Sequence, residues 1–199
     1  QQTDYKPTLR AIYDEVLMRG QCYQTLDYLC NSIGGRLSGS PQAEQAVKYM
    51  FTKMQSYGFD TVFLQPVMVP HWERGAKEEA FIAKGRQKFD VRICALGGSV
   101  ATPLTGLDAE VIEVQSLAEL KELGKEKITG KIVFFNRPMD PKHIHTGAAY
   151  GGAGDQRRNG ATEAAKVGAI GAIIRSLSST VNDFPHTGSM AYGTGVPMI

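Results

Sequence analysis

The chain has 199 residues, of which 42% are hydrophobic and 21% are charged, and its formal net charge is +2 at pH 7. This length allows one large domain or two small ones, and the composition is ordinary for a globular protein. The small, scattered charge predicts no nucleic-acid partner, and the longest apolar runs, of about six residues, predict no membrane span, which needs roughly 20.

The chain up to Val69 reads mainly as helices. Apolar residues recur at helical spacing over residues 9–19, and a second helix is predicted over residues 21–33. Ser40 is a predicted N-cap with Pro41 at the first helical position, and the strongly amphipathic helix that follows ends at Gly58. Residues 61–69 then alternate as a strand does.

The cysteines predict no disulfide framework. Cys22 and Cys30 fall on the same predicted helix, about 12 Å apart at 1.5 Å per residue, which is too far for a bridge. Both are therefore interpreted as core thiols, and Cys94, which lies in a strand pattern, is interpreted in the same way.

The composition changes over residues 70–77, which read as a connector between two domains. Strands are predicted over residues 80–84 and 89–96, joined through Gly85, and over residues 109–115. Ser116 and Glu119 have the spacing of a capping box, and the helix that they open is predicted to end near Gly124.

A strand–helix–strand unit follows. The pattern predicts strands over residues 131–136 and 169–174, a glycine-rich connection and a helix over residues 155–167. Such a crossover makes the two strands parallel and lays the helix on one sheet face. Residues 178–195 read as a long loop and residues 196–199 as the start of a strand, which predicts that the sequence is a piece of a longer protein.

The residues taken alone predict no catalytic apparatus in this chain. Gly152 and Gly154 match a dinucleotide fingerprint whose third glycine is replaced by Arg157, so a plain loop is favoured. His143 and His145 lack the helical spacing of paired zinc ligands, and solvated loop histidines are the favoured interpretation.

Three residues are candidates for a substrate pocket. Arg175 follows the second parallel strand, and ligand sites gather beyond the carboxyl ends of such strands. His186 and Thr187 lie in the long loop that comes next, where functional residues are common. An ordinary surface charge and an ordinary turn remain the alternatives for these positions.

Several segments resemble known families. Residues 129–133 together with 164–176 look like the protease-associated (PA) domain, and residues 33–41, I-G-G-R-L-S-G-S-P, resemble a segment near the N-terminus of zinc exopeptidases of the aminopeptidase and glutamate carboxypeptidase family. Residues 70–75 and 185–188 are similar to its plasma glutamate carboxypeptidase-like branch.

The resemblance implies a mixed α/β fold in two parts. Residues 1–71 would be the N-terminal helices and first strand of a truncated α/β peptidase domain, and residues 72–199 a swivelling β/β/α PA domain that covers the cleft and controls substrate access. Two zinc ions would be bound by the peptidase domain downstream. No catalytic or metal-binding residue is expected in this chain, which would be inactive alone.

The resemblance also implies short peptides or dipeptides as substrates and the rest of the peptidase domain as a partner, and leaves aminopeptidase and carboxypeptidase activity both open. A secreted or periplasmic location is expected, because the polar start, Gln1 onward, suits a mature chain, although an arbitrary boundary suits it equally. The alternatives are a free-standing PA module that binds protein or peptide without catalysis and, less favoured, a hydrolase using His143 and His145. A homodimer is possible, and the apolar helices before Val69 predict self-association.

Overall fold

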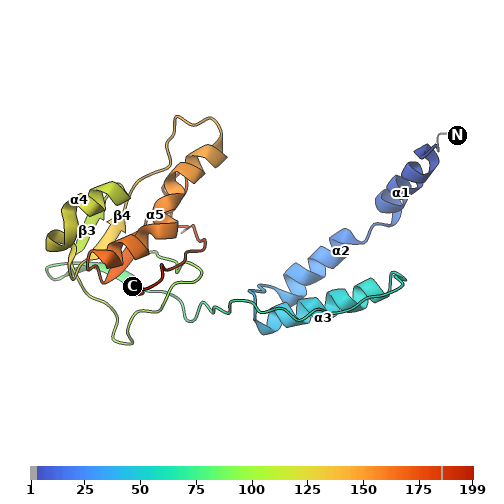
Figure 1. Ribbon diagram of the computed structural model, residues 1–199, viewed down its shortest axis with the longest axis horizontal. Coiled ribbons are helices and arrows are strands. Elements are labelled where there is room, and N and C mark those ends of the chain that lie inside the picture. The colour runs from blue at the N-terminus through green and yellow to red at the C-terminus, as the bar shows by residue number, and fades with distance from the viewer. Residues whose placement is uncertain (1–3, 185) are drawn as a thin grey trace. The chain divides into compact units, whose positions relative to one another are not determined.

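The computed structural model describes residues 4–184 and 186–199 and divides into two compact units, Gln1–Glu73 and Arg74–Ile199 (Figure 1). The first unit has helices as its regular structure, and the second combines helices with two sheets. The mixed α/β class is thereby confirmed. The assignment of residues 1–71 to a peptidase and of 72–199 to a PA domain stays a prediction.

The first unit contains three helical stretches close to those predicted. They are α1 (Lys6–Arg19), α2 (Cys22–Asp27) continuing directly into the π-helix η1 (Tyr28–Ile33), and α3 (Pro41–Gln55). Helix α3 begins as predicted, because Ser40 Oγ accepts a hydrogen bond from Ala43 N at 3.1 Å.

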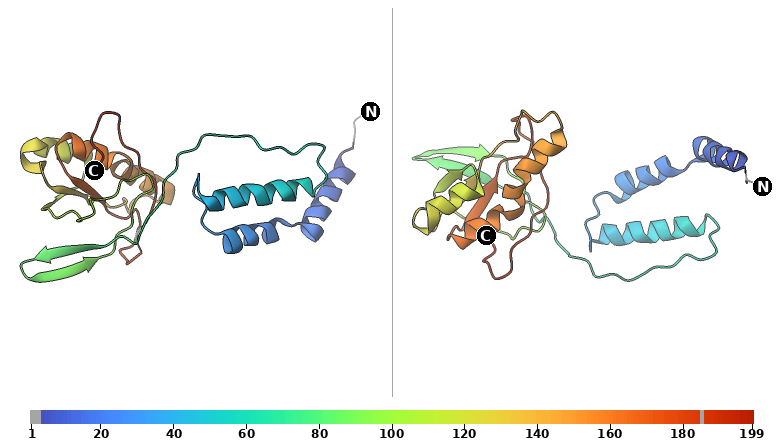
Figure 2. Two further views of the ribbon diagram at one scale, coloured as in Figure 1. Left: turned by 90° about the horizontal axis from the view of Figure 1, so that it is seen from below. Right: turned by 45° about the horizontal axis from the view of Figure 1, so that its top comes forward.

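Helices α2 and η1 run antiparallel to α3, side by side with it in both views of Figure 2. Lys53 Nζ near the end of α3 donates to Gln21 Oε1 before α2 at 2.6 Å, and the rings of Tyr28 and Tyr49 lie 4.3 Å apart. This helical pair nevertheless has no core, since none of the described residues of the first unit is buried.

Two predictions for the first unit are wrong. Cys22 and Cys30 are exposed rather than core thiols, because α3 packs beside their helix without burying their side chains. Residues 61–69 form no strand. A strand needs a hydrogen-bonding neighbour, and the described residues of this unit supply none. Met68, for example, is 99% exposed.

The second unit opens with an antiparallel hairpin, β1 (Ala80–Lys84) and β2 (Gln87–Val91), which turns at Gly85 with φ of 61°. The second strand was predicted over residues 89–96, but β2 begins two residues earlier and ends at Val91. Strand β2 ends where β1 can no longer pair with it, with Val91 opposite Ala80.

A three-stranded parallel sheet is the centre of the second unit. It consists of β3 (Val111–Val114), β4 (Ile132–Phe135) and β5 (Gly171–Ile174) in that order, joined by helices α4 (Leu117–Ile128) and α5 (Thr146–Lys166). The predicted parallel strand–helix–strand unit is confirmed by the pairing of β4 with β5.

Both helices pack on the same sheet face. The alternating residues Val133 and Phe135 of β4 are fully buried there. They belong to one apolar cluster with Val114, Leu120, Ile128, Ala164 and Ala169. Helix α5 comes very close at Gly160, where a Cβ would lie 3.0 Å from Phe135 Cε2 and 3.1 Å from Ile174 Cδ1. Glycine at this position lets the helix approach the sheet closely, and a larger residue would require the Phe135 and Ile174 side chains to shift by a few tenths of an ångström.

Helix α4 begins where it was predicted to begin but continues beyond its predicted end near Gly124. Ser116 Oγ accepts from Glu119 N at 3.0 Å, as the capping box requires, whereas the Glu119 carboxylate accepts from Gln115 N instead of reaching Ser116 N. Gly124 is non-helical, with φ of 63°, and a last turn continues to Ile128, which is fully buried. Burial of Ile128 in the core explains the extra turn.

Helix α5 begins much earlier than predicted, at Thr146 instead of residue 155. The segment interpreted as a glycine-rich loop is helical because Ala149 and Ala153, four residues apart, are buried on one helix face. At the other end of the unit, residues 196–199 form no strand, but Ile199 packs against the core. No helix among the described residues is long and apolar enough to span a membrane.

Candidate functional site

The carboxyl ends of β4 and β5 bring two polar segments together. Phe135 and Ile174 are paired at the ends of these parallel strands, so the residues that follow them lie side by side. Arg175 N donates to Phe135 O at 2.9 Å, and Arg175 Nη1 donates to Asn136 Oδ1 at 3.0 Å. Arg175 therefore lies at the carboxyl edge of the sheet, where the sequence predicted it.

His186 lies next to this edge. Its backbone N–H donates to Ser176 Oγ at 3.1 Å, which ties it to the residue after Arg175. Its ring Nε2 is 3.1 Å from the hydroxyl oxygen of Tyr150, and the two rings meet edge to face with centroids 5.6 Å apart. Tyr150 lies in the first half of α5, where the sequence predicts a glycine-rich connection instead of a helix.

Arg157 completes the cluster from the same helix. It lies seven residues after Tyr150, two turns along one face of α5, and its Nη1 donates to the Tyr150 hydroxyl. The guanidinium carbon is 5.1 Å from the centre of the Tyr150 ring. Gly188 also approaches the guanidinium, so closely that a Cβ there would lie 2.7 Å from Arg157 Nη1. We call Tyr150, Arg157, Arg175 and His186 the arginine cluster.

The charge of the arginine cluster is not balanced locally. The ion pairs among the described residues include neither Arg157 nor Arg175. The neighbouring carboxylate of Asp155 is already paired with Arg137 and also accepts from Gln156 N at 2.8 Å. Arg157 Nε is buried and finds no hydrogen-bond partner in the described part of the chain. The site is therefore suited to a group that carries negative charge.

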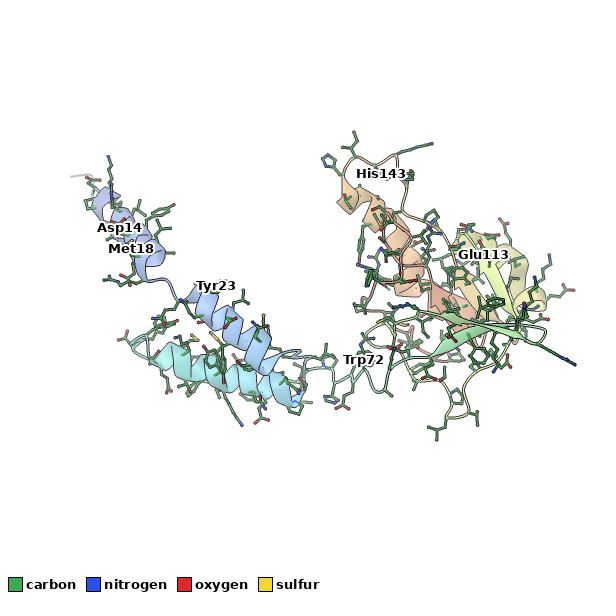
Figure 3. The ribbon with its side chains drawn as sticks, turned by 180° about the vertical axis from the view of Figure 1, so that it is seen from behind. Asp14, Met18, Tyr23, Trp72, Glu113 and His143 are labelled. Carbon is green, nitrogen blue, oxygen red and sulfur yellow. The ribbon has the colours of Figure 1, made fainter. Side chains whose placement is uncertain are left out.

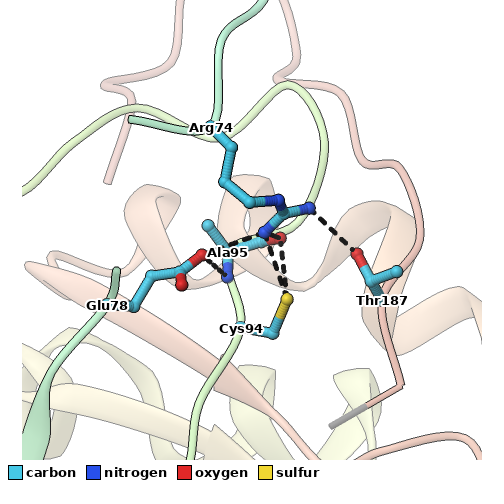
Figure 4. A network of polar contacts seen from close by, with 5 residues as sticks. All are labelled: Arg74, Glu78, Cys94, Ala95 and Thr187. Carbon is cyan, nitrogen blue, oxygen red and sulfur yellow. Dashed lines mark hydrogen bonds and ion pairs between the residues drawn. The ribbon is translucent and has the colours of Figure 1, made fainter. Parts of the chain in front are cut away.

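Thr187 belongs to a neighbouring network. Its hydroxyl accepts from Arg74 Nη2 at 3.3 Å, and Arg74 Nη1 donates to Glu78 Oε1 at 2.9 Å and to Ala95 O at 2.7 Å (Figure 4). Hydrogen bonding by the Ala95 backbone amide, with a smaller contribution from Arg74, lowers the pKa of Glu78 below the ordinary 4.5. Glu78 is therefore held as a carboxylate.

The three predicted pocket residues thus make three different contacts. Arg175 bonds to Asn136, His186 to Tyr150, and Thr187 to Arg74. Tyr150 and Arg157 are site residues that the sequence pattern does not predict. Their spacing of seven would have placed them on one face, had the helix been extended back to Thr146.

The nucleotide and metal interpretations find no support. Gly152, Gly154 and Arg157 lie inside α5 rather than at a strand-to-helix turn, so they cannot cradle a pyrophosphate as the fingerprint does. His143 (Figure 3) and His145 precede α5, and both are exposed. In the described part of the chain, no three His, Cys, Asp or Glu side chains are grouped to hold a metal ion.

No family model matches the chain. It is 40% identical over 200 residues to carboxypeptidase Q of Xenopus laevis, covering 99% of this chain and 40% of that protein. It is likewise 40% identical over 189 residues to human carboxypeptidase Q, covering 95% of this chain and 37% of that protein. The chain therefore spans about two fifths of the length of the curated relatives it matches.

A solved structure matches nearly the whole fold. It is a peptidase M28 precursor from Shewanella amazonensis, with a TM-score of 0.82 and 33% sequence identity over 97% of this chain and 43% of that one. These similarities show that the chain belongs to the M28 peptidase family, on its carboxypeptidase Q-like (plasma glutamate carboxypeptidase-like) branch.

Proposed function

We propose that these residues are the substrate-access portion of a zinc-dependent exopeptidase, and that the arginine cluster binds the terminal carboxylate of a short peptide. The observation that carries this proposal is that two guanidinium groups, Arg157 and Arg175, have no ion-pair partner among the described residues. Arg157 bonds to Tyr150, which contacts His186, and His186 is bonded to Ser176, the residue after Arg175. Guanidinium groups bind carboxylates through charge-assisted hydrogen bonds. The relatives are named carboxypeptidases, whose substrates end in such a group.

In this proposal residues 72–199 form a PA domain over the cleft of the whole enzyme and limit entry to small peptides. Their role is binding and orientation, with Arg175, His186 and Thr187 as wall residues. Hydrolysis is assigned to parts of the full-length protein outside these residues, so the isolated chain is expected to be inactive. The location proposed for the enzyme is secreted or periplasmic.

We assign the two zinc ions to the same parts of the full-length protein, outside these residues. The donor side chains described in this chain do not fit a zinc centre, since no group of three gathers among them. None of its residues is therefore given a role toward the metal, and no step of the reaction is routed through it.

The test is kinetic and uses the full-length enzyme. Arg157→Ala should lower kcat/KM for dipeptides with a free carboxyl terminus by roughly 10- to 100-fold, the effect of losing a hydrogen bond to a charged group. Dipeptides with an amidated carboxyl terminus should be poor substrates for the parent enzyme and should lose little more in the variant. Arg175→Ala and His186→Ala should alter KM on the same panel.

Arg86→Ala is the matched control, because Arg86 is an exposed arginine in the hairpin turn of the same unit. Its kinetics should equal those of the parent. If Arg157→Ala, Arg175→Ala and His186→Ala all left free and amidated substrates unchanged, the cluster would have no role in binding. A stop codon directly after Ile199 in the gene would instead favour a binding module without catalysis.

A further inference from the structure

Arg74 joins three separate stretches of the second unit. Its Nη1 lies 2.9 Å from Glu78 Oε1, 2.7 Å from Ala95 O and 3.1 Å from Cys94 Sγ, while Nη2 donates to Thr187 Oγ1 at 3.3 Å. Figure 4 shows the guanidinium between these groups. One planar side chain thus uses both of its terminal nitrogens on different segments.

The first two stretches make a closed frame around the base of the hairpin. Glu78 precedes β1 and Ala95 follows β2, and Ala95 N donates directly to Glu78 Oε1 at 2.7 Å. Arg74 bonds to the same carboxylate oxygen and to the carbonyl of the same alanine. The frame therefore holds the guanidinium in one orientation even without Thr187.

Thr187 lies in a segment that we call the site loop, residues 186–190. The loop is anchored on both sides of Thr187: His186 N donates to Ser176 Oγ at 3.1 Å, and Gly97 N donates to Gly188 O at 2.7 Å. Met190 N also donates to Gly97 O at 2.9 Å. Between these anchors, the Arg74–Thr187 contact is the side-chain bond that fixes the middle of the loop.

We propose that Arg74 is a positioning residue: through Thr187 it holds the site loop so that His186 stays against Tyr150 and Gly188 stays against Arg157. This inference rests on the proposed function of the arginine cluster and adds a residue that lies outside it. Arginine is required because a lysine ammonium is a single point donor and cannot reach Glu78 and Thr187 at once.

The experiment measures amide hydrogen exchange of the site loop in the full-length enzyme, together with dipeptide kinetics. Arg74→Ala and Thr187→Val should speed exchange of the Met190 amide by roughly tenfold, as expected for the loss of a hydrogen bond to a charged group. Both variants should raise KM with little change in kcat. The double variant should resemble Arg74→Ala, because Thr187→Val removes a contact that Arg74→Ala has already removed.

Matched variants separate positioning from general damage to the fold. Thr187→Ser keeps the hydroxyl that accepts from Arg74 and should retain the parent's exchange at Met190, and Arg86→Ala should change neither exchange nor kinetics. Arg74→Lys should resemble Arg74→Ala. Unchanged exchange at Met190 in Arg74→Ala would overturn the positioning role whatever the cluster does. Faster exchange with unchanged KM would overturn the link to substrate and, with it, the pocket role of His186, while Arg157→Ala tests the cluster separately.

Discussion

The helices α3 and α5 show how differently the two units are built. Helix α3 has the clearer amphipathic pattern, a proline at its start and a bonded N-cap, yet none of its residues is buried. Helix α5 is rich in glycine and alanine and has no side-chain cap, yet nine of its residues are buried. The difference lies in the neighbour: α5 has a sheet to lie on, and α3 has only another exposed helix.

The comparison teaches that an apolar stripe predicts a helix but not its burial. In the first unit Leu17 and Met18 are 78% and 82% exposed, which suits a surface covered by a further part of the protein or by a second copy. In the second unit an apolar cluster is buried between the parallel sheet and its helices. Stability of the 199-residue chain should therefore come almost wholly from the second unit.

The largest expected effect tests whether the stability of the chain comes from the second unit. Phe135→Ala empties a fully buried site between the sheet and α5 and should lower the free energy of unfolding by about 3–5 kcal/mol. Leu17→Ala, in the exposed stripe of α1, should change it by less than about 0.5 kcal/mol. Urea unfolding followed by circular dichroism measures both.

Val111→Ala is the control within the sheet, because Val111 lies on β3 and is 55% exposed. It should lower the free energy of unfolding much less than Phe135→Ala does. A loss for Leu17→Ala as large as that for Phe135→Ala would show that the first unit has a core of its own.

An intermediate effect compares the two bonded N-caps. Ser116→Ala removes the cap of α4 and should lower the unfolding free energy of the second unit by about 1 kcal/mol, because α4 packs into the core. Ser40→Ala removes the equivalent bond of α3 and should reduce the helical signal while leaving the main urea transition unchanged. Ser116→Asp, which keeps a capping oxygen, is the control. Equal shifts of the main urea transition in both alanine variants would contradict the view that the second unit alone carries the stability of the chain.

The elements most readily predicted from sequence were those defined by local chemistry. Ser40 with Pro41, and Ser116, start helices because their side chains satisfy free backbone amides within the same turn. The parallel pairing of β4 and β5 follows from the crossover between them. Arg175 was placed correctly for the same reason, since it directly follows a parallel strand.

The features that could not be predicted from the sequence depend on contacts with residues far away in the chain. Residues 61–69 alternate like a strand but have no partner to pair with among the described residues. The first half of α5 looked like a loop because glycine is a poor helix former, and burial of Ala149 and Ala153 against the rest of the unit outweighs that propensity. Tyr150 and Arg157 were missed with it, and the reach of Arg74 to Thr187 links residues far apart in the chain.

The smallest expected effect concerns acid and separates the carboxylates of the two units. In the first unit, the side chains of Arg19 and Lys48 lower the pKa values of Glu15 and Glu44 within single exposed helices. In the second unit, the Ala95 amide lowers the pKa of Glu78 across the base of the hairpin. Because its folded pKa lies below the ordinary 4.5, Glu78 contributes stability above that pH and loses it as the pH falls through the folded value.

Glu78→Gln should therefore flatten the acid side of the stability curve of the second unit, with a change within the ~0–1 kcal/mol of partly exposed ion pairs. Urea midpoints at neutral pH and below the ordinary carboxyl pKa measure it, with Glu44→Gln as the control that leaves the curve unchanged. The exposed pair of Glu44 with Lys48 lies outside the cooperative unit, so its loss should only fray α3. An acid slope that survives in Glu78→Gln would mean that other carboxylates of the second unit carry the effect, with Glu163 beside Lys166 the first to replace.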